Sequence, residues 1–568
     1  TLFELLPVRG LSMADDGTMA FSWHGDIYTL RPGRNPSRLD ITIAVDGPGG
    51  EPENVTKRGG ASEFAVSPGG KEVAFVVRGE VFVTSVEFGT TRRITDTPEQ
   101  ERSVSFSPDG RSLIYAGERD GSWNVYESSL VDDDELYFFS ATKIEEKPVV
   151  ATDADEFQPA YSPDGEKVAY LFERNEIRVF DTETGETATA LPGDKFYSYE
   201  DGDLWYDWSP DGRWIATQFY SRGRIFYTEV GLVPADGEGD FIELSNSGYD
   251  DMRPRFAMEG GAVIWMTDRY GMRAQGSWGA ENDVVAAFLT QDAYDRFRLS
   301  KEEYELRKEL EEKKKDADKD DGGDDEKAES DDAGEMEADA DEEDNDTDEE
   351  TDEDEDADGV EPIEIEREGL DERRARLTPN ASLLGGFAMS PEGDKIYYLA
   401  KFEKGFDLWT HDFRESSTKI LAKLGASSAS MEMSDDGGAI FLLADGSLSK
   451  IDANSGERKG ISFAAGMTVD RAAERGSLLG HVWRQTLKKF YRPDMHGVDW
   501  SYYLGQYRPK LADVTNNRDF AVILSEMLGE LNASHTGGIY RPGHKDGDDS
   551  TASLGVIYDN TYAGPGAR

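Results

Sequence analysis

A histidine that directly follows a predicted helix is the strongest candidate for chemistry in this sequence. Between residues 519 and 531 the apolar residues recur at helical spacing, which predicts an amphipathic helix. The helix ends at Asn532-Ala-Ser-His535, a position that holds the backbone of His535 while its ring can face a cleft. Because an imidazole titrates near neutral pH, it can take a proton from a hydroxyl and return it to a leaving amine. Such a histidine is therefore a candidate for acid–base chemistry.

The other groups of a catalytic constellation are not visible in the sequence. It contains no cysteine and no Gly-x-Ser-x-Gly elbow. A lone histidine after a helix is more often a capping or surface residue, so the spacing alone leaves a structural role open for His535. The remaining histidines form no metal-binding pair, which predicts no metal site, and no cofactor is implied. They are His24, His411, His481, His496 and His544.

The composition indicates several domains and argues against nucleic acid or a membrane as partner. Of the 568 residues, 37% are hydrophobic, which is enough for more than one core. The formal net charge of −56 repels nucleic acid and anionic membrane surfaces. No run of about eighteen apolar residues is present, so we predict no transmembrane helix. Because residue 1 is Thr, we expect the natural N-terminus to lie upstream, which leaves the compartment open.

One short phrase recurs at intervals of roughly 35 to 55 residues, the range typical of propeller blades. Its clearest form is Phe106-Ser-Pro-Asp-Gly110. Proline presets φ, aspartate bonds to nearby backbone and glycine supplies a positive φ, so each copy predicts a tight turn between two strands. Clear copies begin at Phe64, Phe106, Tyr161, Trp208 and Met389, and degenerate copies at Ala14, Met258 and Ser434.

These eight copies, each followed by short apolar runs, predict a mainly β fold. One small sheet cannot bury both of its faces, so several sheets must stack around an axis. We therefore predict a seven- or eight-bladed β-propeller, with blades in residues 1–296 and again in residues 376–466. A β-sandwich built from repeated hairpins is the alternative.

Residues 297–375 interrupt the repeat. Up to about residue 315 the charges have helical i, i+4 spacing. From Asp316 to Asp358, 27 acidic residues stand against two lysines, a composition that cannot offset the entropy of ordering. We predict a disordered acidic insert between blades. Inside it Asp354-Glu-Asp-Ala-Asp-Gly359 matches half of an EF-hand loop, but Ile365 occupies the position of the bidentate glutamate, which argues against calcium binding.

After about residue 467 the alternation typical of strands gives way to helical spacing. One apolar face is predicted to hold Leu479, Val482, Trp483, Leu487 and Phe490. With the helix at 519–531, this pattern predicts a small α-helical subdomain over residues 467–546.

This helical region resembles a known peptidase family. The segments that carry the resemblance are Val482-Trp-Arg484, Phe490-Tyr491, His496-Gly-Val-Asp-Trp500 and Leu528-Gly-Glu-Leu-Asn-Ala-Ser-His535. They are similar to the first catalytic subdomain of the tricorn proteases, which are self-compartmentalising serine peptidases of the S41 type. The Ser-Pro-Asp-Gly repeat likewise resembles TolB-type and tricorn-type propellers. Leu554-Gly-Val-Ile-Tyr558 is similar to the opening of the family's PDZ-like domain, so residues 547–568 would begin that domain.

The resemblance implies a serine peptidase in which His535 is the general base and Ser534 helps to form a tetrad. It implies that the nucleophilic serine and the acid of the tetrad lie beyond the PDZ-like domain, outside this chain, so that the chain alone is inactive. It also implies peptide substrates filtered by the propeller, no cofactor, assembly into homo-oligomers and a cytoplasmic location, with export as the alternative.

Two other functions remain open. A non-enzymatic TolB-like propeller scaffold would bind a protein or peptide partner across its face, but it would not need Asn-Ala-Ser-His at a helix end. A prolyl-oligopeptidase-like enzyme also joins a propeller to a hydrolase. That enzyme requires a Gly-x-Ser-x-Gly elbow on an α/β sheet, and the helical stretch after the propeller does not lead into one.

Overall fold

The computed structural model describes residues 8–23, 25–41, 52–197, 204–221, 227–273, 279–321 and 361–542. They divide into two units, which we describe separately: Asn54–Thr468 is one, and Thr1–Glu53 with Val469–Arg568 is the other. Within these ranges no helix combines the length and the apolar character needed to cross a membrane.

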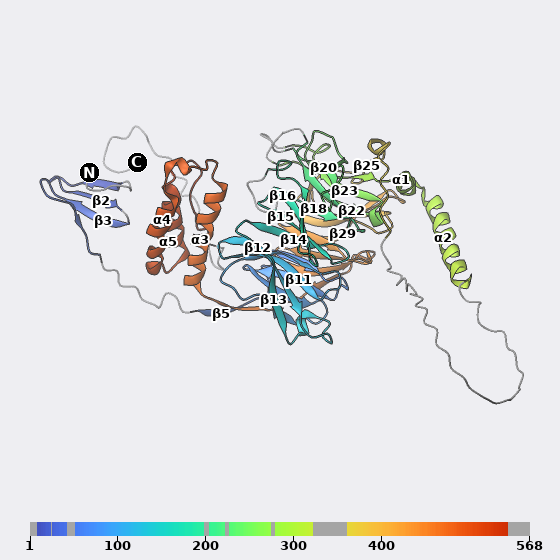
Figure 1. The fold of residues 1–568 in the computed structure, drawn as a ribbon, viewed down its shortest axis with the longest axis horizontal. Coiled ribbons are helices and arrows are strands. Elements are labelled where there is room, and N and C mark those ends of the chain that lie inside the picture. Colours follow the sequence, from blue (N-terminus) through green and yellow to red (C-terminus); the bar gives the residue numbers. More distant parts are fainter. Residues whose placement is uncertain are drawn as a thin grey trace, which may run out of the picture. The chain divides into compact units, whose positions relative to one another are not determined.

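Seven four-stranded sheets, which we number as blades 1 to 7, form a ring in the described part of the first unit (Figure 1). Each blade is an antiparallel meander of strands in chain order. Blades 1 to 4 consist of β6 (Glu63–Val66), β7 (Glu72–Val77), β8 (Glu80–Ser85), β9 (Thr91–Arg93); β10 (Glu101–Phe106), β11 (Ser112–Arg119), β12 (Ser122–Leu130), β13 (Ile144–Val150); β14 (Glu156–Tyr161), β15 (Lys167–Phe172), β16 (Glu176–Asp181), β17 (Thr187–Leu191); and β18 (Tyr206–Trp208), β19 (Trp214–Phe219), β20 (Glu229–Pro234), β21 (Ile242–Glu243). Blades 5 to 7 consist of β22 (Asp251–Ala257), β23 (Ala262–Thr267), β24 (Asp283–Phe288), β25 (Arg374–Arg376); β26 (Leu383–Met389), β27 (Lys395–Lys401), β28 (Phe406–Asp412), β29 (Ser417–Ala426); and β30 (Ala429–Met433), β31 (Ala439–Ala444), β32 (Ser447–Asp452), β33 (Arg458–Ile461). The mainly β propeller fold is confirmed.

The recurring phrase forms the turn between the first two strands of a blade, as predicted. In blade 2 the N–H of Gly110 donates to the Ser107 carbonyl oxygen at 2.9 Å, and Gly110 has a φ of 71°. This is the left-handed region that glycine adopts without steric cost. Asp109 Oδ1 accepts from the N–H of Arg111 at 2.9 Å, and Ser107 Oγ accepts from the N–H of Ser112 at 2.8 Å. Every polar residue of the phrase therefore serves the turn.

The ring closes by packing of blade 7 against blade 1, without exchange of a strand. The N–H of Val66 on β6 donates to Glu432 Oε1 on β30 at 3.2 Å. The rings of Phe75 on β7 and Phe463, just after β33, lie 4.4 Å apart. Side chains and backbone thus join the ends of the ring.

Buried carboxyls that the sequence reasoning did not identify hold the first strand of a blade to the segment that leads into it. Glu101 is fully buried, and its Oε1 accepts from Thr97 Oγ1 at 2.7 Å and from Arg119 Nη2 at 3.0 Å. Burial raises the pKa of Glu101 to about 7. A hydroxyl four residues before the acid is the sequence signal that could have found such sites. The pairs are Thr97–Glu101, Thr152–Glu156 and Ser247–Asp251.

The acidic insert lies inside blade 5, which corrects the prediction that it separates two blades. β25 follows the insert and pairs with β24, which precedes it, in the register Val285↔Arg376. The buried guanidinium of Arg373 holds the segment that leads into β25 against the end of β24. Its Nε donates to the carbonyl of Phe288 at 3.1 Å and its Nη1 to that of Glu368 at 2.8 Å. The strand that follows the insert thus completes the four-stranded sheet of blade 5 as its last strand.

The helical start of the insert consists of α1 (Gln291–Arg298) and α2 (Lys301–Asp321), followed after the undescribed residues by the short 3-10 helix η4 (Leu370–Glu372). α2 begins with a capping box, in which the N–H of Ser300 donates to Glu303 Oε2 at 2.9 Å. The helix runs past Asp316, where we predicted disorder to begin. Residues 322–360, which include the rest of the predicted disordered tract and the six residues of the EF-hand match from Asp354 to Gly359, lie outside the described residues.

The second unit combines a sheet from the start of the chain with helices near its end. The sheet contains β1 (Arg9–Met13), β2 (Met19–Trp23), β3 (Asp26–Leu30) and β4 (Ser37–Arg38), and the helices are α3 (Arg471–Lys489), η5 (Met495–Gly497), α4 (Trp500–Tyr507), η6 (Arg508–Asp513) and α5 (Asn517–Gly529). The phrase copy at Ala14 forms the β1–β2 turn. The predicted propeller range of 1–296 therefore differs from the structure at its start, because this sheet belongs with the helices and the ring contains the other seven copies.

Candidate active site

The first helix of the candidate region begins at an aspartate cap. Asp470 Oδ1 accepts from the N–H groups of Ala472 and Ala473 at 2.9 and 3.0 Å, which satisfies two of the free donors at the start of α3. Leu479 is fully buried in the core of the unit, and Val482, Trp483 and Phe490 pack against the same cluster. Leu487 is 44% exposed, so its predicted place on the apolar face is wrong.

Two tryptophans lock α3 to α4. Trp483 Nε1 donates to the carbonyl oxygen of Trp500 at 2.9 Å, and Trp500 Nε1 donates to that of Trp483 at 3.0 Å. Trp500 is buried. Because each indole N–H has the other residue's carbonyl oxygen as its acceptor, Trp500 is buried and Trp483 partly buried without loss of a hydrogen bond.

α5 presents the apolar face that its spacing predicts. Its cap is Asn516, whose Oδ1 accepts from the N–H of Asp519 at 2.9 Å. All six predicted positions join the hydrophobic cluster of the unit, with Leu531 fully buried at the helix exit. They are Phe520, Ile523, Leu524, Met527, Leu528 and Leu531.

A buried carboxylate holds the end of α5. Glu530 Oε1 accepts from Tyr507 Oη at 2.8 Å and from Arg9 Nη2 at 3.1 Å, and only 6% of the Glu530 side chain is exposed. Burial, followed by the hydrogen bond to Glu530, raises the pKa of the Tyr507 hydroxyl. The sequence reasoning missed this contact, since Arg9 lies 521 residues away along the chain.

Ser534 and His535 come after Glu530 in the chain and lie on an exposed turn. His535 has a φ of 62°, a conformation that a residue with a side chain adopts only when its surroundings hold it there. The next residues are tied back to α5, because Ser525 Oγ donates to the Gly538 carbonyl and accepts from the Gly538 N–H, both at 2.9 Å. Within the described ranges neither the Ser534 nor the His535 side chain has a hydrogen-bond partner.

The structure brings a second histidine to the end of α5. His496 lies on η5 with a φ of 57°, and its Nδ1 is 3.4 Å from the carbonyl oxygen of Leu531. Its Nε2 is hydrogen-bonded to the hydroxyl of Tyr491, and the ring of Phe490 lies 5.2 Å away in an edge contact. The sequence analysis assigned no role to the His496 side chain. Its contact with Leu531, just after α5, supports the segment that leads to His535.

No metal site accompanies these residues in the part of the chain that the structure describes. His411 lies on β28 in blade 6, where its Nδ1 is 2.8 Å from Thr418 Oγ1, and burial lowers its pKa. His481 lies on α3. His24, His544 and the PDZ-like segment 554–558 lie outside the described residues.

The geometry provides an accessible imidazole on an ordered backbone. Such a group can act as a general base when a hydroxyl nucleophile is brought to it. Ser534, its neighbour in the chain, is equally exposed and could donate to a charged partner.

Comparisons with known proteins find similarity to tricorn proteases. Residues 471–529 match the model of the tricorn protease C1 domain. The chain is 28% identical over 207 residues to "Tricorn protease homolog 1" of Streptomyces coelicolor, an alignment that spans 34% of this chain and 18% of that protein. A second tricorn protease homologue of the same organism is 43% identical over 67 residues, which span 12% of this chain and 6% of the relative.

A solved structure shares the fold. The crystal structure of the tricorn protease superposes with a TM-score of 0.65 at 14% identity, over 95% of this chain and 48% of that one. The chain thus spans less than half the length of each of these relatives.

Proposed function

Taking the tricorn protease homology of this chain as the premise, we propose that it is part of a serine peptidase that cleaves peptides, with His535 as the general base. The observation that carries the proposal is the position of this histidine. The residues that match the C1 domain end with α5, and His535 is presented on the ordered, exposed turn that follows. A base in this place can reach a nucleophile that approaches from another segment.

Ser534 is proposed to stabilise the charged intermediate of the reaction. The nucleophilic serine is supplied by sequence outside this chain, so the chain alone is inactive. The propeller filters peptides by size on their way to the site, since a ring of blades encloses a channel. Assembly into homo-oligomers and a cytoplasmic location belong to the same proposal, which rests on similarity to the family.

The test uses the full protein that contains this chain, with a quenched fluorescent peptide as substrate. Replacement of His535 by alanine is expected to lower kcat about 10⁴-fold with little change in KM, since a lost general base affects the transition state and not substrate binding. Ser534→Ala is expected to lower kcat about ten- to a hundredfold, the effect of one hydrogen bond to a charged group.

His411→Gln serves as the matched control, because it removes an imidazole from blade 6 and leaves the candidate site unchanged. Activity within about twofold of the parent is expected for it. If His535→Ala keeps the activity of the parent protein, His535 is not the base. If the parent protein cleaves no peptide, a non-enzymatic propeller scaffold becomes the better account.

A further inference from the structure

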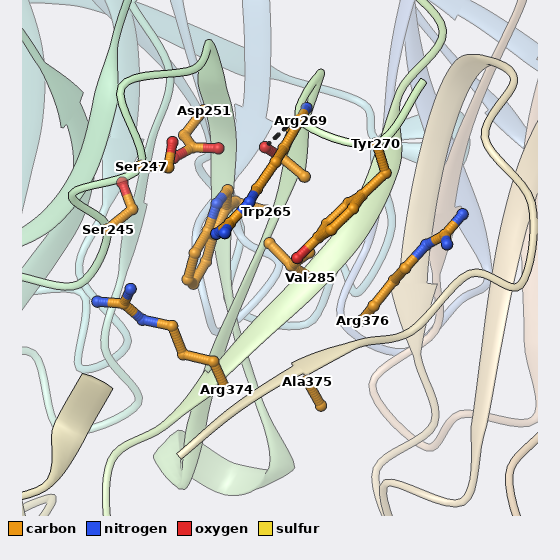
Figure 2. A pocket seen from close by; sticks show the side chains of 11 residues that line it. Ser245, Ser247, Asp251, Trp265, Arg269, Tyr270, Val285, Arg374, Ala375 and Arg376 are labelled. Atoms are coloured by element: carbon orange, nitrogen blue, oxygen red, sulfur yellow. Dashed lines mark hydrogen bonds between the residues drawn. The ribbon is translucent and has the colours of Figure 1, made fainter. Parts of the chain in front are cut away.

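A small pocket lies on the side of blade 5 that packs against blade 4 (Figure 2). Its volume is about 100 Å³. Trp265 on β23 and Val285 on β24 form its apolar part, and both belong to the hydrophobic cluster that joins blades 4 and 5. Because strands of a propeller sheet support these residues, the pocket is a fixed feature of the ring.

Three arginines line the pocket in a chain with a net charge of −56. Arg376 forms an ion pair with Asp283, whose Oδ1 accepts from Arg376 Nε and Nη2 at 3.0 and 2.8 Å. Figure 2 shows Arg376 extending away from Arg374, past Tyr270. Two guanidinium groups, those of Arg269 and Arg374, are therefore available to a ligand.

Arg269 and Arg374 differ in whether a carboxylate neutralises their charge. Arg269 is in no ion pair with a carboxylate of the described residues, and its guanidinium lies 5.5 Å from the ring centre of Tyr270. Arg374 pairs with Asp371, whose side chain is 84% exposed. An ion pair with a solvent-exposed partner is weak, so the half-buried Arg374 keeps charge for a ligand, and the exposed Arg269 can also turn its charge toward an anion in the pocket.

Two donors in the pocket wall also lack an acceptor among the described residues. They are the indole Nε1 of Trp265, a residue only 2% exposed, and Nε of Arg374. A buried N–H without an acceptor costs about 1–3 kcal/mol, and most such groups in folded proteins have a partner. A ligand that brings oxygen acceptors would satisfy both.

One acceptor faces the same pocket. Asp251 is 1% exposed, and its Oδ2 accepts from Ser247 Oγ at 2.7 Å, whereas its Oδ1 has no donor among the described residues. The Ser245 hydroxyl is already donated to Glu229 at 2.7 Å. A fully deprotonated anion would meet the free Asp251 oxygen with repulsion, whereas an anion that keeps one hydroxyl would donate to it.

We propose that this pocket, named here the blade 5 pocket, binds inorganic phosphate and discriminates against sulfate. Arg269, Arg374 and the Trp265 indole donate to phosphate oxygens, and Asp251 Oδ1 accepts from the phosphate hydroxyl. At neutral pH inorganic phosphate retains a hydroxyl, whereas sulfate has none and a phosphate monoester has lost most of its own. The pocket does not involve the peptidase residues, so its test and that of the proposed peptidase activity succeed or fail separately.

The test is isothermal titration of the protein with sodium phosphate, sodium sulfate and glycerol phosphate at neutral pH. Phosphate is expected to bind with a Kd of about 1 mM or tighter, and sulfate and glycerol phosphate at least about tenfold more weakly. Arg269→Met and Trp265→Phe are each expected to weaken phosphate about tenfold. Asp251→Asn is expected to reduce the preference for phosphate over sulfate, because an amide can donate to either anion.

Arg213→Met is the control, since it removes the same charge from an exposed turn of blade 4. Far-ultraviolet circular dichroism shows whether each variant is folded, and Trp265→Phe provides the conservative change if Arg269→Met does not fold. Absence of phosphate binding up to about 10 mM overturns the proposal. Equal binding of sulfate, or binding that Arg269→Met and Trp265→Phe leave unchanged, overturns it as well.

Discussion

Replacing Glu101 by glutamine isolates the effect of one buried carboxyl on the pH dependence of folding. Glu101 is fully buried at the start of β10, and burial raises its pKa from 4.5 to about 7, with the nearby Glu80 carboxylate adding to the rise and Thr97 and Arg119 opposing it. Glutamine keeps an oxygen that can accept from Thr97. Arg119 keeps Glu146 as a partner, with Nη2 and Oε2 3.1 Å apart.

The direction of the stability change with pH follows from where Glu101 binds its proton. Between about pH 4.5 and pH 7 the folded chain holds a proton on Glu101 that the unfolded chain releases, so this group loses stabilising effect as pH rises. A pKa difference of about 2.5 corresponds to about 3 kcal/mol, which is an upper bound because neighbouring groups adjust. Glu101→Gln cannot ionise. Its free energy of unfolding relative to the parent is therefore expected to rise by up to about 3 kcal/mol between about pH 5 and pH 8.

Urea unfolding followed by tryptophan fluorescence at a series of pH values measures this difference. Glu166→Gln, which changes an exposed carboxyl in the β14–β15 turn, is the matched control and should follow the parent at every pH. The reasoning is refuted if Glu101→Gln and the parent change in parallel between about pH 5 and pH 8, since the carboxyl would then titrate alike in the folded and unfolded chain.

Substitutions at four further residues test the packing of the helices that precede His535. Leu531→Ala is expected to lower the free energy of unfolding of its unit by about 2–4 kcal/mol, and Leu487→Ala by less than about 1 kcal/mol, because the first side chain is fully buried and the second is 44% exposed. Urea unfolding gives both values, and equal losses would contradict the burial. Tyr507→Phe is expected to cost about 1–2 kcal/mol by leaving Glu530 with one donor fewer. A double-mutant cycle with Glu530→Ala, which removes the acceptor, should give a coupling energy near 1 kcal/mol, and a value of zero would show that the hydrogen bond contributes nothing.

The features predictable from sequence are those in which neighbouring residues act on each other. The turn at Ser107–Gly110 is one, since its hydrogen bonds span at most five residues. The apolar face of α5 is another, because helical spacing decides which side chains meet. The end of that helix and the exposed turn after it could be anticipated for the same reason.

Contacts between distant segments were not predictable in this way. The phrase at Ala14 specifies a turn between two strands, but not whether their sheet joins the ring. Likewise, the return of β25 to β24 across the acidic insert depends on the buried guanidinium of Arg373. Glu530 and Arg9 are paired only because two ends of the chain fold into one unit. The role of His535 as a base stays a prediction, and the pocket on blade 5 required the packed side chains.

The chain enters and leaves the propeller at adjacent strands, so the ring is an insertion, here called the cassette, that could be removed without separating the segments on either side. β5 (Glu53–Lys57) pairs with β34 (Ala465–Val469), and Thr468 Oγ1 lies 2.8 Å from Asn54 Oδ1. A loop of a few residues could bridge so short a gap at little entropic cost. The sheet and helices on either side of the cassette could then be produced as one continuous polypeptide, and a ring with other blades could be grafted between the same two strands.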